Sequence, residues 1–152
     1  MPFSDAELDD LVAGLGTFYD KRVAVFAEVK GQPAGFLLGV PDMNQVLKLA
    51  YPRPGKPELL TKLQILWHWK VRSKIKRLRI PLMGVRAEFR GIGVETAMFS
   101  ELYERALSFA PETGWYSADG GWVLETNEPM QRLCDMHNGT VYKRFRFYER
   151  AL

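Results

Sequence analysis

The stretch from Arg79 to Met98, RIPLMGVRAEFRGIGVETAM, constrains the fold more than any other part of the chain. It begins with the apolar run Ile80–Val85, which is typical of a strand, and then crosses a short charged segment to the turn Arg90-Gly91-Ile92-Gly93. Apolar residues follow at helical spacing, which predicts a helix with one buried face: Val94, Ala97, Met98, Leu102, Ala106 and Phe109. The chain must therefore place a strand, a glycine turn and a helix in direct succession.

A glycine turn that opens a helix is a physical device for holding an anion. The first N–H groups of a helix have no partner inside the helix, and the helix dipole favours negative charge beside them. Glycines remove the Cβ atoms that would keep a ligand away. The turn Arg90–Glu95 is therefore a phosphate-sized cradle. A Gly-x-Gly at such a junction is more often only a tight turn, so the rest of the chain must decide.

The composition indicates one globular domain over residues 1–152. Hydrophobic residues make up 47% and charged residues 26% of the chain, which is ordinary for a protein with a packed core. Cys134 is the single cysteine, which excludes an internal disulfide and a cysteine-based zinc cluster. His68 and His137 lie far apart in sequence and make no metal-ligand spacing. We therefore expect no metal site.

Charge and hydropathy argue against a membrane partner and against a nucleic-acid partner. The N-terminus, MPFSDAE, has neither a basic segment nor an apolar one, and no run approaches a membrane span. We expect a cytoplasmic protein with no membrane partner. The net charge of +3 is small, although six basic residues fall within residues 70–79. That run is either a solvated helix end or a patch for an anionic partner; a nucleic-acid partner lacks any recognised reading motif.

The remaining elements follow from periodicity and capping signals. We predict a helix over 4–19, a hairpin of strands over 21–30 and 35–40 turning at 31–33, a helical insert over 41–79, a strand over 115–124, a further helix and a last strand over 140–148. Ser4 and Glu7 form a capping box for the first helix, and Thr126 or Asn127 caps the last one. This order predicts an α/β fold with a mixed, mostly antiparallel sheet flanked by helices.

These residues resemble the GNAT superfamily of acyl-CoA-dependent N-acyltransferases, and the C-terminal lobe of uncharacterised bacterial GNAT-like proteins. The pyrophosphate motif of the superfamily reads Gln/Arg-x-x-Gly-x-Gly/Ala, and Arg90 and Gly93 fit its first two positions. Its later Asn-x-x-small-x-x-Leu pattern fits Asn127 and Leu133. The resemblance implies a GNAT-like fold whose first strand is missing here, with acetyl-CoA as co-substrate.

The resemblance also assigns roles to residues. It implies that the strand containing Met83 and Val85 presents backbone groups to the pantetheine arm of acetyl-CoA, and that Asn127 bonds the same arm. The pyrophosphate would lie on the turn, which comprises Arg90, Gly91, Ile92, Gly93, Val94 and Glu95. A primary amine, small or on a protein, would attack the thioester directly, with a strand N–H stabilising the oxyanion.

Three features depart from the family pattern. Glu95 stands where the motif has Gly or Ala, which places a carboxylate near the expected pyrophosphate. Cys134 stands where many members have the tyrosine that protonates the leaving thiolate. Glu88, Asp119 and Glu125 are the acids nearest the expected site, and each of them is a candidate general base, directly or through water. The missing first strand leaves an open sheet edge, which predicts a homodimer. The alternative to an enzyme is therefore a non-catalytic GNAT-like module that binds CoA, regulates or dimerises.

Overall fold

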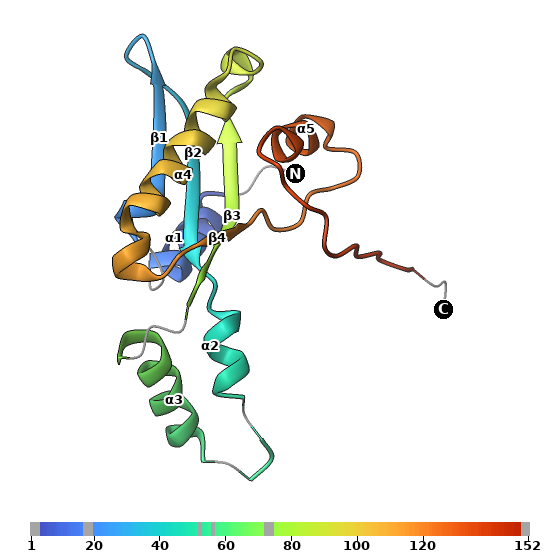
Figure 1. Ribbon diagram of the computed structural model, residues 1–152. Coiled ribbons are helices and arrows are strands. Elements are labelled where there is room, and N and C mark those ends of the chain that lie inside the picture. Colours follow the sequence, from blue (N-terminus) through green and yellow to red (C-terminus); the bar gives the residue numbers. More distant parts are fainter. Residues whose placement is uncertain (1–3, 17–19, 52, 56, 72–74, 150–152) are drawn as a thin grey trace. The chain divides into compact units, whose positions relative to one another are not determined.

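The computed structural model describes residues 4–16, 20–51, 53–55, 57–71 and 75–149 (Figure 1). The chain forms two compact units, Met1–Gly121 and Trp122–Leu152. Each unit is described by itself below. The expectation of a single domain over 1–152 stays a prediction.

A four-stranded sheet with the order β1-β2-β3-β4 organises the first unit. Its strands are β1 (Ala24–Val29), β2 (Gln32–Pro41), β3 (Arg77–Val85) and β4 (Ser117–Asp119). The first two pairings are antiparallel and the β3–β4 pairing is parallel. The mixed, mostly antiparallel sheet is confirmed, and β1 lies at one edge of it.

The long helix α4 (Val94–Thr113) covers one face of this sheet and supplies much of its core. It lies across β1 and β2, as Figure 1 shows. Its residues Val94, Met98 and Leu102 are buried together with Val25 and Leu37 of the hairpin. The apolar spacing of the sequence therefore predicted the helix and most of the face that it buries, although Ala97, which was expected on this face, is exposed.

The hairpin turns earlier than predicted. The turn consists of Lys30 and Gly31, with φ of 51° and 78°, and Gln32 already pairs with Val29. Two residues with positive φ match the right-handed twist of a hairpin, and the glycine at the second position adopts this conformation without strain. The predicted turn over 31–33 therefore begins one residue and ends two residues too late. Pro33 already lies in β2, beside an irregularity in the pairing.

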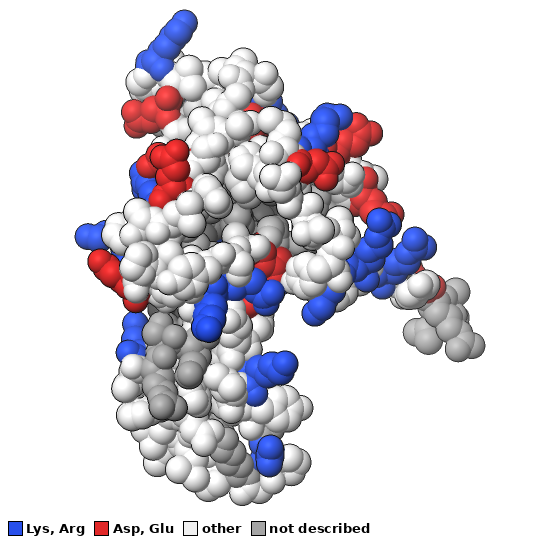
Figure 2. Space-filling model, in the orientation of Figure 1, with Lys and Arg blue, Asp and Glu red and all other residues white. Residues whose placement is uncertain are grey.

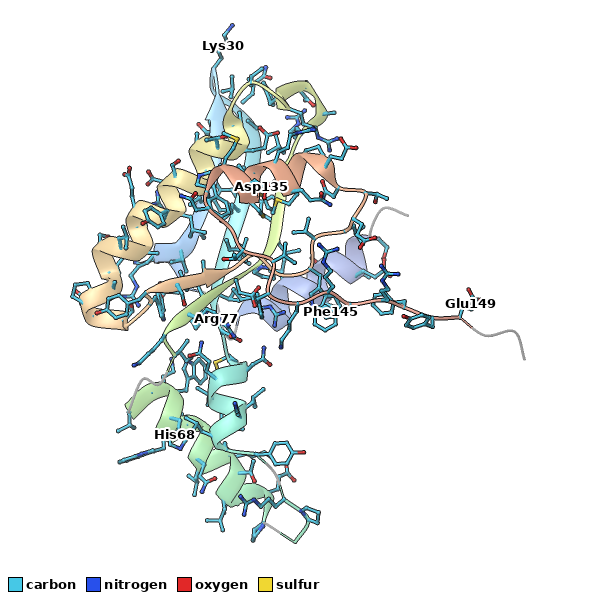
Figure 3. The ribbon with its side chains drawn as sticks, turned by 45° about the vertical axis from the view of Figure 1, so that its right-hand side comes forward. Lys30, His68, Arg77, Asp135, Phe145 and Glu149 are labelled. Carbon is cyan, nitrogen blue, oxygen red and sulfur yellow. The ribbon has the colours of Figure 1, made fainter. Side chains whose placement is uncertain are left out.

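The predicted helical insert between the hairpin and the central strand is confirmed. It contains α2 (Asn44–Leu49), α3 (Glu58–Leu66) and the π-helical turn η2 (Trp67–Val71). Its two ends are joined at the sheet by an ion pair: Arg77 Nη2 and Nε donate to Asp42 Oδ2 at 2.6 and 2.9 Å. Figure 3 labels Arg77 at this junction. Arg77 and Arg79 therefore belong to β3, and the prediction that the whole basic run closes a helix is wrong for these two residues.

The N-terminal helix α1 (Asp5–Gly16) begins with the predicted capping box. The Ser4 N–H and hydroxyl donate to Glu7 Oε2, both at 2.8 Å, and Glu7 N–H donates to Ser4 Oγ at 3.4 Å. The predicted last turn of this helix, residues 17–19, lies outside the described residues.

The second unit contains one helix, α5 (Glu128–Met136), within its described part. Asn127 caps it, because Asn127 Oδ1 accepts from the N–H of Met130 at 3.3 Å. The strand predicted over 140–148 is wrong: those residues join no ladder. An alternating pattern favours a strand only where a neighbouring strand supplies hydrogen bonds.

The strand predicted over 115–124 shortens to the three residues of β4, in the first unit.

Candidate functional site

The central strand β3 and the strand beside it part halfway along their length. The β3–β4 ladder joins Arg77–Arg79 to Ser117–Asp119 and goes no further within the described residues. At that point Asp119 Oδ1 accepts the N–H of Gly121 at 2.9 Å, which turns the chain out of β4. The segment Ile80–Val85 therefore continues as a strand that is paired on one side only.

The backbone of that segment points its unpaired groups in a definite direction. Arg86 N–H donates to the carbonyl of Ala34 in β2 at 2.9 Å, just after the register pair Gly35–Val85. Because successive residues of a strand direct their N–H and C=O groups to opposite sides, Met83 and Val85 direct theirs away from β2. Arg90 Nε donates to the Val85 carbonyl at 3.0 Å, which fits this direction.

The glycine turn that follows is open at both glycines. After the 3-10 turn η3 (Ala87–Phe89), Gly91 and Gly93 adopt φ of 75° and 95°, and Gly93 is the N-cap of α4. A Cβ built on either glycine meets no atom within 4 Å. No side chain therefore crowds the turn at these two glycines, as an anion cradle at the start of α4 requires.

Three charged side chains flank this turn. Arg86 pairs with Glu88, Nη2 to Oε1, at 2.6 Å, and because both side chains are at least half exposed, water screens this pair. Glu95 lies in the first turn of α4 and is half-buried. Its charge is favourable toward the helix dipole but unfavourable toward a pyrophosphate on the same N–H groups. Met83, Val85 and residues 90–95 all belong to the first unit, where the glycine turn follows β3 directly, and their role in binding acetyl-CoA stays a prediction.

The other predicted site residues lie in the second unit and are described separately. The Oδ1 atom of Asn127 is engaged in the helix cap, which leaves its Nδ2 as the group for a ligand. The side chain of Glu125 is exposed, and its carbonyl accepts Gln131 Nε2 at 2.9 Å. Burial raises the pKa of the Cys134 thiol, and the neighbouring Asp135 carboxylate raises it further. Cys134 is therefore a protonated thiol at neutral pH.

The sequence did not single out an apolar depression beside the end of β3. It lies on the sheet and is lined by Phe26, Pro33, Phe36, Gly84 and Arg86, among others. The Phe36 ring lies over Gly84, where an added Cβ would come within 3.1 Å of it. The alternation in β1 and β2 could have indicated it. Phe26 follows the buried Val25 and Phe36 precedes the buried Leu37, so both rings lie on the other face of the sheet.

The described residues were also compared with the requirements of a metal site and of a membrane-spanning helix. No group of three or more His, Cys, Asp or Glu side chains is arranged to hold a metal ion there. No helix in that part of the chain is both long and apolar enough to cross a bilayer.

Solved structures place this architecture among the GNAT acetyltransferases. The chain superposes over 99% of its length on 82% of the aminoglycoside acetyltransferase AAC(6')-Iy in complex with a CoA bisubstrate analogue, with a TM-score of 0.58 and 14% identity. A second structure of that enzyme, in complex with CoA, gives a TM-score of 0.55 at 12% identity and covers 95% of this chain and 89% of the other. The chain therefore has the GNAT acetyltransferase fold.

Curated sequences give relatives of a different size. Bacterial ceramide synthase of Caulobacter vibrioides is 30% identical over 99% of this chain, and Protein YghO of Escherichia coli K12 is 26% identical over 100% of it. The chain spans 38% of the length of each of these two relatives. No family model matches the sequence.

Proposed function

We propose that the chain is an acyl-CoA-dependent N-acyltransferase. One observation carries this proposal: the course of β3. After Arg79 it leaves its ladder with β4, the backbone N–H and C=O groups of Met83 and Val85 point away from β2, and the strand leads into an open glycine turn at the start of α4. Pantetheine is an amide chain that bonds to a strand edge, and the pyrophosphate of CoA is an anion that suits a helix start. Strand edge and cradle stand in the order in which acyl-CoA presents these groups.

The reaction would need little covalent help from the protein. A neutral amine attacks the thioester carbonyl, a C–N bond forms, and the C–S bond breaks as the tetrahedral intermediate collapses. An outward N–H of β3, at Met83 or Val85, would stabilise the oxyanion. The amine loses a proton to a base, for which Glu125 is our candidate through water.

The leaving thiolate of CoA must take up a proton. Cys134 occupies the position that the GNAT resemblance assigns to the proton donor. A thiol whose pKa is raised is a weaker acid than an ordinary thiol, so burial makes Cys134 a poorer donor to the CoA thiolate than an exposed cysteine would be. Cys134 remains our candidate for this proton donor.

The acceptor that we favour is a primary amine with an apolar body. A ceramide is the amide of a long-chain amino alcohol, and one relative bears the name bacterial ceramide synthase. The apolar depression around Phe36 and Gly84 adjoins the end of β3, and we propose it as the surface that the body of the amine contacts. Both observations favour a long-chain amine over a polar one.

The alternative is a non-catalytic GNAT-like module. Glu95 favours it, because a carboxylate in the first turn of α4 opposes a pyrophosphate there. Such a module would bind acyl-CoA weakly or not at all and would act through a partner. A homodimer formed at the outer edge of β1 remains a prediction on either account.

Calorimetric titration with acetyl-CoA and palmitoyl-CoA separates the two. We expect binding in the micromolar range, lost in Gly93→Glu, whose new carboxylate fills the cradle. Gly31→Glu is the matched control: this glycine also has positive φ and open space around it, but it lies in the hairpin turn. Equal loss in both variants would point to backbone strain, and no binding by the unmutated chain would favour the module.

Turnover is a separate measurement. Release of free CoA thiol from palmitoyl-CoA would be followed with a long-chain amino alcohol and with a short polar amine. We expect thiol release with the long-chain acceptor. CoA binding without thiol release from any amine would retain the cradle and contradict the transferase.

A further inference from the structure

The helix α3 turns its apolar side outward. None of its residues is buried, and neither is any residue of the following turn η2. Six large apolar side chains in these two elements are 50% to 68% exposed: Leu59, Leu60, Leu63, Leu66, Trp67 and Val71. At 3.6 residues per turn they fall within an arc of about 140° on the helix. An exposed apolar stripe of this size on a folded chain marks an interaction surface.

The opposite side of the same helix already has its contacts. Ile65 and Trp69 are only partly exposed and pack against the core of the first unit. The insert is also held at its base by the Arg77–Asp42 ion pair and by Lys76 N–H, which donates to Gln45 Oε1 at 3.1 Å. The outward stripe therefore cannot turn inward without breaking these contacts.

The charge of the insert selects the kind of partner. The sequence from Asn44 to Lys76 holds eight Lys and Arg residues and one acid, Glu58, for a net charge of +7. The whole chain is +3, so the remainder is −4. Figure 2 shows Lys and Arg but no Asp or Glu on the visible face of the insert, the lower part of the picture. Two such inserts would repel each other, whereas an anionic surface would attract either one.

We propose that the helical insert docks on the surface of a bilayer that contains anionic phospholipids. Leucine and tryptophan side chains would enter the boundary between headgroups and acyl chains, and lysines at the rim would extend to the phosphates. This proposal differs from the expectation of no membrane partner, which considered only segments that span a bilayer.

Sedimentation with vesicles tests the proposal on the full chain. The vesicles contain phosphatidylcholine alone or with phosphatidylglycerol. We expect binding to the anionic vesicles, weak binding to the neutral ones, and a clear loss when NaCl is raised from about 0.1 M to about 0.5 M. No binding to anionic vesicles, or equal binding to both kinds, would overturn the proposal.

Matched variants show whether the stripe makes the contact. Leu63→Gln with Leu66→Gln removes two stripe residues that are 53% and 51% exposed, and Leu107→Gln removes one on α4 that is 48% exposed. We expect the double variant to bind anionic vesicles at least about tenfold more weakly and the control to bind as the unmutated chain does. Circular dichroism melts check that the variants fold.

Light scattering and a DNA shift cover the other occupants of the surface. Vesicle binding unchanged in the folded double variant would overturn the proposal. So would a dimer that the double variant converts to a monomer, because a second copy would then cover the stripe. Binding to duplex DNA without binding to vesicles would show that the basic residues serve a nucleic acid instead.

Discussion

The helices α4 and α3 carry similar apolar spacing and opposite burial. In α4 the spacing lies against β1 and β2, and Met98 and Leu102 are almost completely buried. In α3 the leucines at comparable spacing face outward and no residue is buried. Periodicity therefore shows that a helix has an apolar face. It does not show what covers this face, because the covering element lies elsewhere in the chain or outside it.

The largest expected difference between the two helices comes from shortening one leucine in each. Leu102→Ala should lower the free energy of unfolding by about 3 kcal/mol, because it leaves a cavity between α4 and the sheet. Leu66→Ala should change it by at most about 0.5 kcal/mol. Urea unfolding followed by circular dichroism measures both. Similar losses in the two variants would mean that α3 is covered in solution by another part of the protein.

The ion pair that joins the insert to the sheet should come next. Asp42 is 1% exposed and Arg77 is 36% exposed, so Asp42→Asn leaves a cation half out of water and should cost about 2 kcal/mol. The unfolding midpoint in urea at pH 7 measures this loss. An unchanged midpoint would show that the insert does not depend on this pair.

The same pair predicts a pH dependence. Burial of Asp42 acts to raise its pKa, but the hydrogen bonds from Arg77 and Asn44 outweigh it and the pKa is lowered. A lowered folded pKa contributes stability that is fully present above the unfolded value of about 3.9 and is lost as the pH falls through the folded value. Urea midpoints between about pH 6 and pH 3 should therefore fall less in Asp42→Asn than in the unmutated chain. Asp20, whose pKa is lowered by its hydrogen bond with Arg22, contributes equally to both.

The smallest expected effect compares an ion pair of each helix. Arg105 of α4 donates to Glu101 at 2.6 Å and also to the Ala24 carbonyl of β1 at 3.0 Å, whereas Lys62 of α3 contacts Glu58 at 2.7 Å. Arg105→Gln should cost about 1 kcal/mol and Lys62→Gln at most about 0.5 kcal/mol. Thermal melts of the two variants measure the difference, and an equal cost would contradict the anchoring role of Arg105.

The sequence was sufficient where structure is decided locally. The capping box at Ser4, the glycine turn before α4 and the Asn127 cap depend on residues within four positions, and all three were predicted. It was insufficient where a distant partner decides. Arg77 joins β3 because its partners lie at Asp42, 35 residues away. The alternating residues 140–148 have no ladder in the described chain, and alternation alone does not supply one.

The candidate site divides in the same way. Backbone direction at Met83 and Val85 followed from a strand that the sequence already showed. The apolar depression at Phe36 and Gly84 required the β2–β3 register, which brings these two residues opposite each other. No pattern within one segment of the chain contains that register.

Amide hydrogen exchange with and without acetyl-CoA tests directly whether β3 and the glycine turn bind acyl-CoA. We expect slower exchange at the N–H groups of Met83, Val85 and residues 92–95 when acetyl-CoA is present, with no change along α3. Protection that appears elsewhere, or no protection at the strand edge and the turn under conditions where acetyl-CoA binds, would contradict the assignment of β3 and the glycine turn as the acyl-CoA site.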